Sequence, residues 1–289
     1  MKKNFFLTLI IVMLFISNNL YSFINYSGGD GSEENPFILS KPADIDQLMS
    51  SYEDWDSYFV VTNNINCSGL IWAQGNPNPI GNYSYPFTGN FDGRNHIISN
   101  ISINHGSFLG FFGYISNANI RNLGLENINI TGVTQGYGGG YGGSFIAGFA
   151  AGDCIGLFCG YAVNSYINKC YSSGNASGRF YIGGFCGSLE SGVFTNCYSL
   201  GNVSGRDYVG GFCGSFGLVY NPFLGGANAV IAKCYSISEP TASEADPVLG
   251  GFIGEYYSGT LECNFWGFSG ADLEDTGNNS DMEIGRAHV

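Results

Sequence analysis

Ile182-Gly-Gly-Phe-Cys-Gly187 and Val209-Gly-Gly-Phe-Cys-Gly214 decide the fold of this chain, because one phrase returns after 27 residues. Ile155-Gly-Leu-Phe-Cys-Gly160 precedes them by the same interval, and Leu249-Gly-Gly-Phe-Ile-Gly254 follows 40 residues later, after an insertion around 217–229. Phe108 to Gly113 is a degenerate earlier copy. A period of this length indicates a repeat architecture, in which each unit contacts mainly its neighbours.

A second phrase alternates with the first. Its copies are Asn168-Lys-Cys-Tyr-Ser-Ser-Gly-Asn-Ala-Ser-Gly178, Thr195-Asn-Cys-Tyr-Ser-Leu-Gly-Asn-Val-Ser-Gly205 and Ala232-Lys-Cys-Tyr-Ser236. We expect two or three short strands per unit, separated by Gly, Asn and Ser turns. So short a unit cannot close a core alone, whereas stacked copies bury a continuous one with strands about 4.8 Å apart. The sequence therefore predicts an all-β parallel β-helix, right-handed by the usual sense of parallel crossovers.

The alternation of side chains within the second phrase predicts which residues enter the core. Cys and Tyr are adjacent in every copy, so the Cys column should point inward and the Tyr column outward. These columns are Cys170, Cys197 and Cys234, and Tyr171, Tyr198 and Tyr235. Asn175 and Asn202 are also in phase, which predicts an Asn ladder at a turn. Gly pairs such as Gly183-Gly184 suit tight corners and close backbone approach.

The N-terminal half is less regular. We expect irregular rungs of the same solenoid at 58–65, 87–92, 96–103 and 120–130. One helix is predicted over 44–52, with Ile45, Leu48, Met49 and Tyr52 on a single face. Such a helix would cover the first rung, since an uncovered end of a parallel stack invites aggregation.

Composition excludes several classes of protein. The chain has 289 residues, of which 45 are Gly and only 11% are charged, so a helix bundle is disfavoured. Hydrophobic residues make up 44%, more than a disordered chain carries. The formal charge of −13 argues against nucleic acid and anionic membrane surfaces as partners.

The two ends are expected to lie outside the fold. Lys2-Lys3 followed by an apolar stretch from Phe5 to Ile16 is typical of a secretory signal peptide, with an N-terminal membrane anchor as the alternative. Residues 283–289 resemble the translation of a sequencing adapter, so His288 is not treated as functional. The predicted divisions are a signal peptide 1–22, a leader with the capping helix 23–57, irregular rungs 58–145, repeats 146–270, a linker or truncated rung 271–282, and adapter read-through 283–289.

Together the phrases resemble the GLUG repeat of secreted bacterial proteins, whose usual core reads Gly-Gly-Leu-Val-Gly. The upstream phrases Gly28 to Ser32, Pro36 to Leu39, Tyr58 to Asn66, Pro79 to Gly81 and Phe87 to Gly93 resemble the leader region of such proteins. The resemblance covers nearly all of 26–267 and implies an extracellular β-solenoid of adhesin-like surface proteins or of an accessory region in secreted proteases. It supplies no catalytic motif. Cys159, Cys186 and Cys213 depart from it, because they stand where the family has an apolar residue.

The nine cysteines are an odd number, so at least one is unpaired within the chain. Adjacent in-phase Cys would have Cα atoms close enough for a disulfide, but parallel in-register side chains fit its dihedral angle poorly. We expect buried, free thiols that act as small apolar filler, and we expect neither a metal site nor a cofactor.

Some parallel β-helices are polysaccharide lyases or hydrolases, which need carboxylates clustered on adjacent rungs. Asp153 and Asp207 are in phase but two rungs apart, with Phe180 between them, and Glu190 has no in-phase acidic partner. The following candidates are interpreted as structural: Arg179 and Arg206 as solvated turn residues, Asp92 and His96 as a turn, Gly28 to Glu34 as an isolated mimic of a calcium loop, and Gly136 to Gly143 as an inserted loop.

The function expected from the sequence is structural or adhesive, without catalysis in this chain. Tyr171, Tyr198 and Tyr235 form a candidate binding surface where aromatic rings could contact sugars, and packing of Tyr on Tyr is the competing interpretation. Host or surface glycans and matrix proteins are the expected partners, with neither nucleic acid nor membrane insertion after signal cleavage. The alternatives are an accessory stalk of a larger secreted enzyme such as a protease, and a carbohydrate-active β-helix enzyme.

Overall fold

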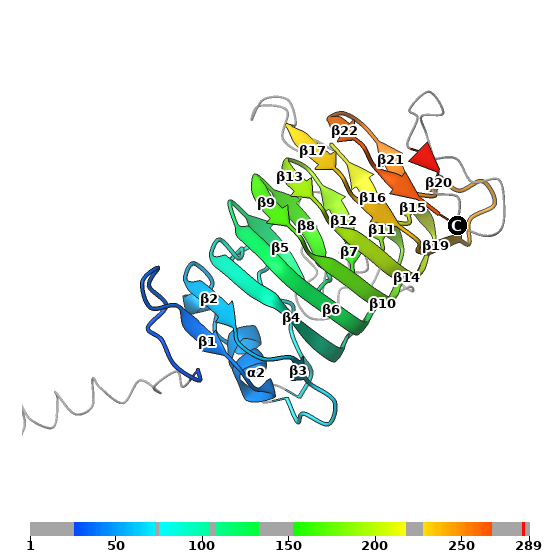
Figure 1. The fold of residues 1–289 in the computed structure, drawn as a ribbon. Coiled ribbons are helices and arrows are strands. Elements are labelled where there is room, and N and C mark those ends of the chain that lie inside the picture. Colours follow the sequence, from blue (N-terminus) through cyan, green and yellow to red (C-terminus); the bar gives the residue numbers. More distant parts are fainter. Residues whose placement is uncertain are drawn as a thin grey trace, which may run out of the picture.

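The chain forms a parallel β-solenoid, as a computed structural model shows (Figure 1). The structure describes residues 26–72, 75–104, 108–132, 153–217 and 228–267, and the backbone of 285–286. The predicted signal peptide 1–22, the loop 136–143, the linker 271–282 and nearly all of the insertion and the C-terminal tail lie outside these residues. All strand pairs of the described residues are parallel, so the predicted fold class is confirmed.

Each 27-residue unit forms one rung of four short strands, where the sequence had suggested two or three. The first full rung contains β7 (Ile155–Gly156), β8 (Cys159–Val163), β9 (Ser165–Asn168) and β10 (Tyr171–Ser177). The second contains β11 (Phe180–Gly183), β12 (Cys186–Leu189), β13 (Gly192–Thr195) and β14 (Tyr198–Gly205). The third contains β15 (Asp207–Gly210), β16 (Cys213–Phe216) and β17 (Ala229–Ala232), and its fourth strand is split into β18 (Tyr235–Ser236) and β19 (Glu239–Ala242), which both pair with β14. The last contains β20 (Leu249–Gly250), β21 (Ile253–Tyr256), β22 (Thr260–Glu262) and β23 (Phe265–Trp266), and β24 (Gly285–Arg286) pairs with β23.

Three parallel sheets run along the solenoid. The first strand of each rung joins a sheet with the order β20-β15-β11-β7, and the second joins one with the order β21-β16-β12-β8-β5. The third and fourth strands join sheet A, whose order is β22-β17-β13-β9-β6-β10-β14-β18-β23-β24. The register follows the repeat, since Cys186 pairs with Cys213 and Tyr171 with Tyr198.

A left-handed residue makes the corner between the third and fourth strands. Asn122, Lys169, Asn196, Lys233 and Cys263 occupy this corner on successive rungs, all with φ between 51° and 56°. Asn adopts this conformation more readily than most residues, whereas Lys and Cys gain no such local advantage. The corner is therefore enforced by the stack as a whole rather than by the identity of its residue.

Stacked aromatic rings fill the core of the repeats. Phe158, Phe185, Phe212 and Phe252 lie face to face along the axis, with ring centroids 4.5 to 4.9 Å apart. The cysteines fill the space beside them as free thiols, eight of them buried, and only Cys263 is exposed. The predicted inward Cys column and outward Tyr column are both observed.

The N-terminal rungs use longer strands. Their elements are β1 (Phe37–Leu39), α2 (Pro42–Ser50), the 3-10 turn η1 (Tyr52–Asp54), β2 (Tyr58–Val61), β3 (Ile65–Asn66), β4 (Asn90–Ile103), β5 (Phe112–Ser116) and β6 (Asn119–Thr131). Residues 90–103 form one strand where the sequence suggested two, because Arg94 and Asn95 turn the corner in the left-handed region without ending the ladder. Sheet A already begins at β1, inside the predicted leader 23–57, since β1 pairs with β2.

Helix α2 covers the first rung, as predicted, and packs Ile45, Leu48 and Met49 into the end of the core (Figure 1). The expectation for Tyr52 was wrong. The helix ends at Ser50, and Tyr52 is 48% exposed and packs against Tyr85 with the ring centroids 4.6 Å apart and the rings tilted by 33°.

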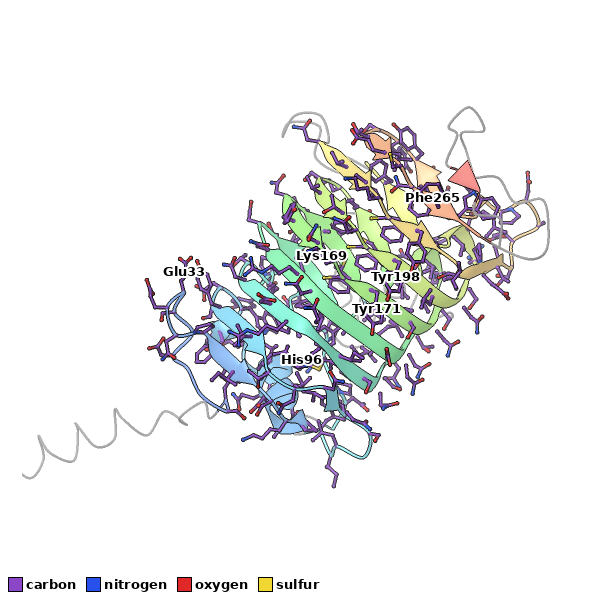
Figure 2. All side chains as sticks on the ribbon, in the orientation of Figure 1. Glu33, His96, Lys169, Tyr171, Tyr198 and Phe265 are labelled. Carbon is purple, nitrogen blue, oxygen red and sulfur yellow. The ribbon has the colours of Figure 1, made fainter. Side chains whose placement is uncertain are left out.

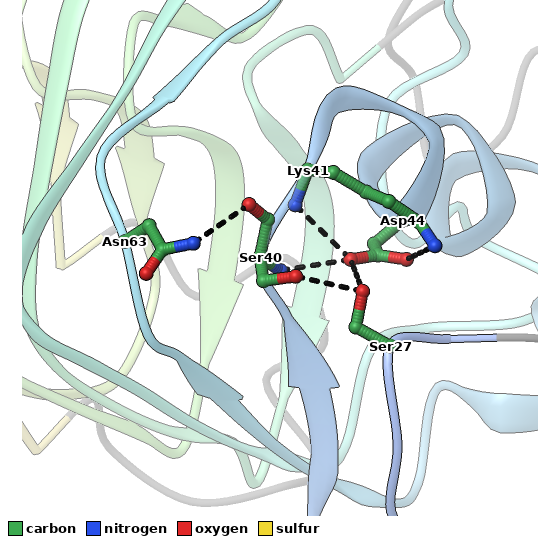
Figure 3. A network of polar contacts seen from close by, with 5 residues as sticks. All are labelled: Ser27, Ser40, Lys41, Asp44 and Asn63. Atoms are coloured by element: carbon green, nitrogen blue, oxygen red, sulfur yellow. Dashed lines mark hydrogen bonds and ion pairs between the residues drawn. The ribbon is translucent and has the colours of Figure 1, made fainter.

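One buried carboxylate fixes the start of this helix (Figure 3). Asp44 accepts hydrogen bonds from the Ser27 hydroxyl at 2.8 Å and from the backbone N–H groups of Ser40 at 2.8 Å and Lys41 at 3.1 Å. The Lys41 ammonium lies 3.8 Å away. A negative charge at a helix N-terminus is stabilising, and Pro42 suits the first turn, so this network anchors the cap to β1.

Candidate functional site

The strongest candidate for a functional surface is the outward Tyr column of sheet A. The rings of Tyr171, Tyr198 and Tyr235, here called the Tyr ladder, lie 4.8 Å apart and are parallel to within 7°. Tyr171 lies over Gly124, where a Cβ would come within 2.5 Å of its ring, and donates a hydrogen bond to Glu126 at 2.7 Å. Figure 2 shows Tyr171 and Tyr198 on neighbouring strands.

Stacking decides which atoms of the ladder a ligand could reach. The ring faces lie against one another, so ring edges and hydroxyls are presented to solvent. Burial raises the pKa of the Tyr198 hydroxyl, and the neighbouring Tyr235 and Glu126 raise it further. Burial likewise raises the pKa of Tyr235. Both phenols therefore stay protonated well into the alkaline range and can donate hydrogen bonds.

Two exposed apolar residues extend this surface, and the sequence analysis did not include them. Phe265 pairs with Tyr235 and is 48% exposed, and Ile237 lies two residues beyond Tyr235 and is 47% exposed. The signal for Phe265 was present, because Phe265-Trp266 occupies the place of Tyr-Ser in the second phrase. The second phrase gave no signal for Ile237, since its third copy ends at Ser236.

The predicted Asn ladder runs beside the Tyr ladder. Asn202 donates to Asn175 at 3.0 Å, and Asn175 donates to Asn129 at 2.8 Å. These side chains lie within strands β6, β10 and β14, so their predicted place at a turn was wrong. The ladder gives sheet A a continuous row of amides beside its row of phenols.

The in-phase charges at the start of the first sheet form a compact cluster. Arg179 is 19% exposed and lies 3.9 Å from buried Asp153, so it is not the solvated turn residue that the sequence suggested. Arg206 is 54% exposed and pairs with Glu244. Both guanidiniums lie over the Phe180 ring, at 5.2 and 5.5 Å from its centroid. The cluster ties three rungs together through ion pairs and cation–π contacts.

Asp207 and Glu190 have local structural partners. The Asp207 carboxylate accepts from the backbone N–H of Val248 at 2.7 Å, which fixes the next rung. Glu190 accepts from the Tyr161 hydroxyl of the preceding rung at 2.5 Å. Burial, together with the hydrogen bond and charge of Glu190, raises the pKa of Tyr161 far above its ordinary value.

Asp92 and His96, predicted to form a turn, lie in strand β4 on either side of its corner at Arg94 and Asn95, whereas Asp30 lies in the loop before β1. Asp92 accepts from Asn122, from the backbone of Arg94 and from Arg121, all at 2.9 to 3.0 Å, while His96 lies 3.3 Å from the side-chain oxygen of Asn64. Asp30 caps its own loop through Ser32 and Asn35. Within the described residues, no three His, Cys, Asp or Glu side chains gather in a way that could hold a metal ion.

Comparison with known proteins supports the fold and finds two sequences that resemble part of the chain. No model of a known protein family matches the chain, so the resemblance to GLUG repeats rests on the sequence phrases alone. A protein of Evansella cellulosilytica provisionally named a Gly-rich membrane protein is 28% identical over 137 residues, 44% of this chain and 16% of that protein. Halomucin of Haloquadratum walsbyi is 32% identical over 107 residues, 36% of this chain and 1% of halomucin.

A solved structure from Bacteroides ovatus, provisionally titled an immunoglobulin A1 protease, has a TM-score of 0.60 and 21% sequence identity. The match covers 90% of this chain and 86% of that one. At this identity the likeness shows the fold alone. In the described part of the chain, no helix has the length and apolar character needed to cross a membrane.

Proposed function

We propose that this chain is an extracellular β-solenoid whose sheet A binds glycans on a cell or matrix surface, and that it carries no catalytic centre of its own. The Tyr ladder is the observation that carries the proposal. It aligns phenols at 4.8 Å intervals along the axis. An extended polymer with repeating polar groups suits such a row, because it can contact several rungs at once.

The composition of the surface supports this assignment. Phenol hydroxyls, Asn amides and the exposed Phe265 and Ile237 combine hydrogen-bonding groups with apolar edges, the mixture by which protein surfaces bind hydroxyl-rich rings. The charge of −13 keeps such a protein soluble outside the cell. Similarity to the provisionally named Gly-rich membrane protein agrees with a place at the cell surface.

A glycan array with the purified chain tests this proposal. Tyr198→Ser and Tyr235→Ser, combined, should reduce binding at least about tenfold, because each removes a ring edge and a donor. Tyr85→Ser is the matched control, since Tyr85 is 53% exposed but lies outside the ladder. Equal loss in the control variant, or no glycan bound by the parent chain, would reject the Tyr ladder as the binding surface.

The second candidate is an accessory stalk of a larger secreted protease, which the likeness to the Bacteroides ovatus structure favours. Under both proposals this chain is non-catalytic. Incubation with immunoglobulin A1 and with neutral and acidic polysaccharides should therefore give no cleavage products. New peptide fragments or new reducing ends would overturn the non-catalytic assignment.

A further inference from the structure

The outer surface of sheet A carries a groove at its N-terminal end, far along the chain from the Tyr ladder. It has a volume of about 360 Å³ and lies where β2, β4 and β6 run side by side. Buried Phe59 and Phe91, each 1% exposed, form part of its lining. Figure 2 places Glu33, which lines the groove, at this end of the molecule.

Two amides lie in the groove without internal partners. Tyr58, Asn90 and Asn119 are neighbours on successive strands. Among the described residues, neither Asn90 nor Asn119 makes a side-chain hydrogen bond. Each amide can donate two hydrogen bonds and accept others, so the pair offers both kinds of group to a ligand. In contrast, the side-chain amides of the Asn ladder form hydrogen bonds with one another.

Two arginines line the groove: Arg121 forms an ion pair with Asp92, and Arg94 does not take part in an ion pair among the described residues. Asp92 is engaged by Arg121, Asn122 and the backbone of Arg94, and these hydrogen bonds lower its pKa although burial opposes them. Arg94 has no ion pair among the described residues, unlike the other three arginines whose side chains the structure describes. Arg94 is exposed and is one of the residues that line the groove.

We propose that this groove binds a single sugar residue that bears a carboxylate, with Arg94 pairing with the carboxylate and Asn90 and Asn119 bonding ring hydroxyls. A guanidinium matches the planar, two-oxygen geometry of a carboxylate. Glu33, which accepts from the Tyr58 hydroxyl at 3.3 Å, offers a further acceptor for sugar hydroxyls. The volume suits one or two sugar rings.

The surroundings favour one acidic sugar over a polyanion or an acidic peptide. Because the chain carries a net charge of −13, it repels the many charges of a long polyanion, whereas a lone carboxylate contacts Arg94 directly. A peptide side chain would have few hydroxyls to satisfy Asn90 and Asn119, and unpaired amides in a closed contact cost binding energy. The groove therefore fits an acidic saccharide best.

Titration of the full chain by NMR with a matched pair of probes tests this assignment. Methyl β-D-glucuronide should bind about tenfold more tightly than methyl β-D-glucoside, which lacks only the carboxylate. Arg94→Asn, chosen because Asn tolerates the φ of 49° at this site, should abolish that difference and leave glucoside binding unchanged. Asn119→Ala should weaken both glycosides.

Two control variants distinguish this groove from binding elsewhere on the chain. Arg206→Asn removes an exposed arginine outside the groove, and Tyr235→Ser changes the Tyr ladder, so both should bind the glucuronide like the parent chain. N-acetylneuraminic acid methyl glycoside distinguishes uronate from sialate as the carboxylate source. Equal binding of both glycosides, tighter binding of N-acetylglutamate amide, or an unaffected Arg94→Asn variant would each overturn the proposal. Failure here would leave the Tyr ladder proposal standing.

Discussion

The irregular rung built on β6 and the regular rungs that follow it fill the same position of the core differently: the first with an apolar side chain, the others with a serine that forms a hydrogen bond. Leu125 occupies an inward position of β6 and is fully buried. Ser172 pairs with it on the next rung, and Ser199 continues the column. Each serine donates across the core to a glycine carbonyl at 2.9 Å, Ser172 to Gly184 and Ser199 to Gly211.

The residues that face this column across the core change together with it. Gly184 and Gly211 follow Leu157 at the 27-residue interval. A Cβ at Gly184 would lie 2.3 Å from the Gly211 carbonyl oxygen and 2.6 Å from the Ser238 hydroxyl. The glycine is therefore needed where a serine reaches across to the backbone. The two recurring phrases meet at this contact, which explains why they recur together.

The sharpest way to break this arrangement is Gly184→Leu, which restores the side chain found at Leu157. The new side chain has no room beside the Gly211 carbonyl, so we expect a loss of about 4 kcal/mol or more in the free energy of unfolding. Gly69→Leu is the control, because nothing lies within 4 Å of a Cβ there. Its φ of +78° should cost that control only about 1–2 kcal/mol. Urea denaturation measures both free energies of unfolding. A Gly184→Leu protein as stable as the control would show that the regular rungs tolerate a leucine at this position, as found at Leu157.

Alkaline pH should destabilise the regular rungs, which contain most of the buried cysteines, more than the irregular rungs. Burial, with smaller effects of neighbouring thiols, raises the pKa of Cys186, Cys197 and Cys213 well above the ordinary thiol value. In the unfolded chain these thiols lose protons above about pH 8.5, so the unfolded state then binds fewer protons and stability falls as pH rises. Each thiol contributes up to about 1.4 kcal/mol per pH unit in the window between the two pKa values.

Hydrogen exchange at pH 8 and at pH 10, corrected for intrinsic exchange rates, tests this expectation. Backbone amides of the rungs in 159–216 should lose protection relative to those in 90–130, which contain no cysteine. Iodoacetamide offers a second readout. Exposed Cys263 should react in the native protein, and Cys186 and Cys213 only after denaturant is added. Rapid native labelling of the latter two would contradict their burial.

The smallest expected effect is the difference in stability lost when Leu125 of the irregular rung and Ser199 of a regular rung are each replaced by Ala. Leu125→Ala should cost about 2–5 kcal/mol, because it leaves a cavity. Ser199→Ala should cost about 1–3 kcal/mol, since the loss of the hydroxyl leaves the buried Gly211 carbonyl with one fewer donor. Thermal unfolding of both variants gives the difference. A larger loss for Ser199→Ala would mean that the hydrogen bond, rather than packing, dominates the regular rungs.

Much of the fold and the three tyrosines of the Tyr ladder could be predicted from the repeat, whereas the groove beside Arg94 could not. The register of Cys186 with Cys213 and of Tyr171 with Tyr198 followed from the period alone. Packing of Tyr on Tyr was one of the two interpretations that the sequence left open, but its face-to-face geometry did not follow from the period, because that geometry depends on the straightness of the stack. Arg94 and Asn119 gave no signal in the sequence, since they lie 25 residues apart and meet only through the register of β4 and β6.

The amino-acid pattern alone predicted a parallel stack with a 27-residue rung, the inward cysteines, the outward tyrosines and a covering helix. These features follow from the local spacing of side chains within each segment and from the interval between copies of the repeat, and both can be read without knowing where the chain turns. The folded chain was needed to see the four strands per rung, the single strand through 90–103, the Ser–Gly contacts across the core and the groove beside Arg94. The reason is physical: corners at Asn122, Lys169 and Cys263 share one left-handed conformation without sharing a residue, so the stack rather than the local sequence fixes where the chain turns.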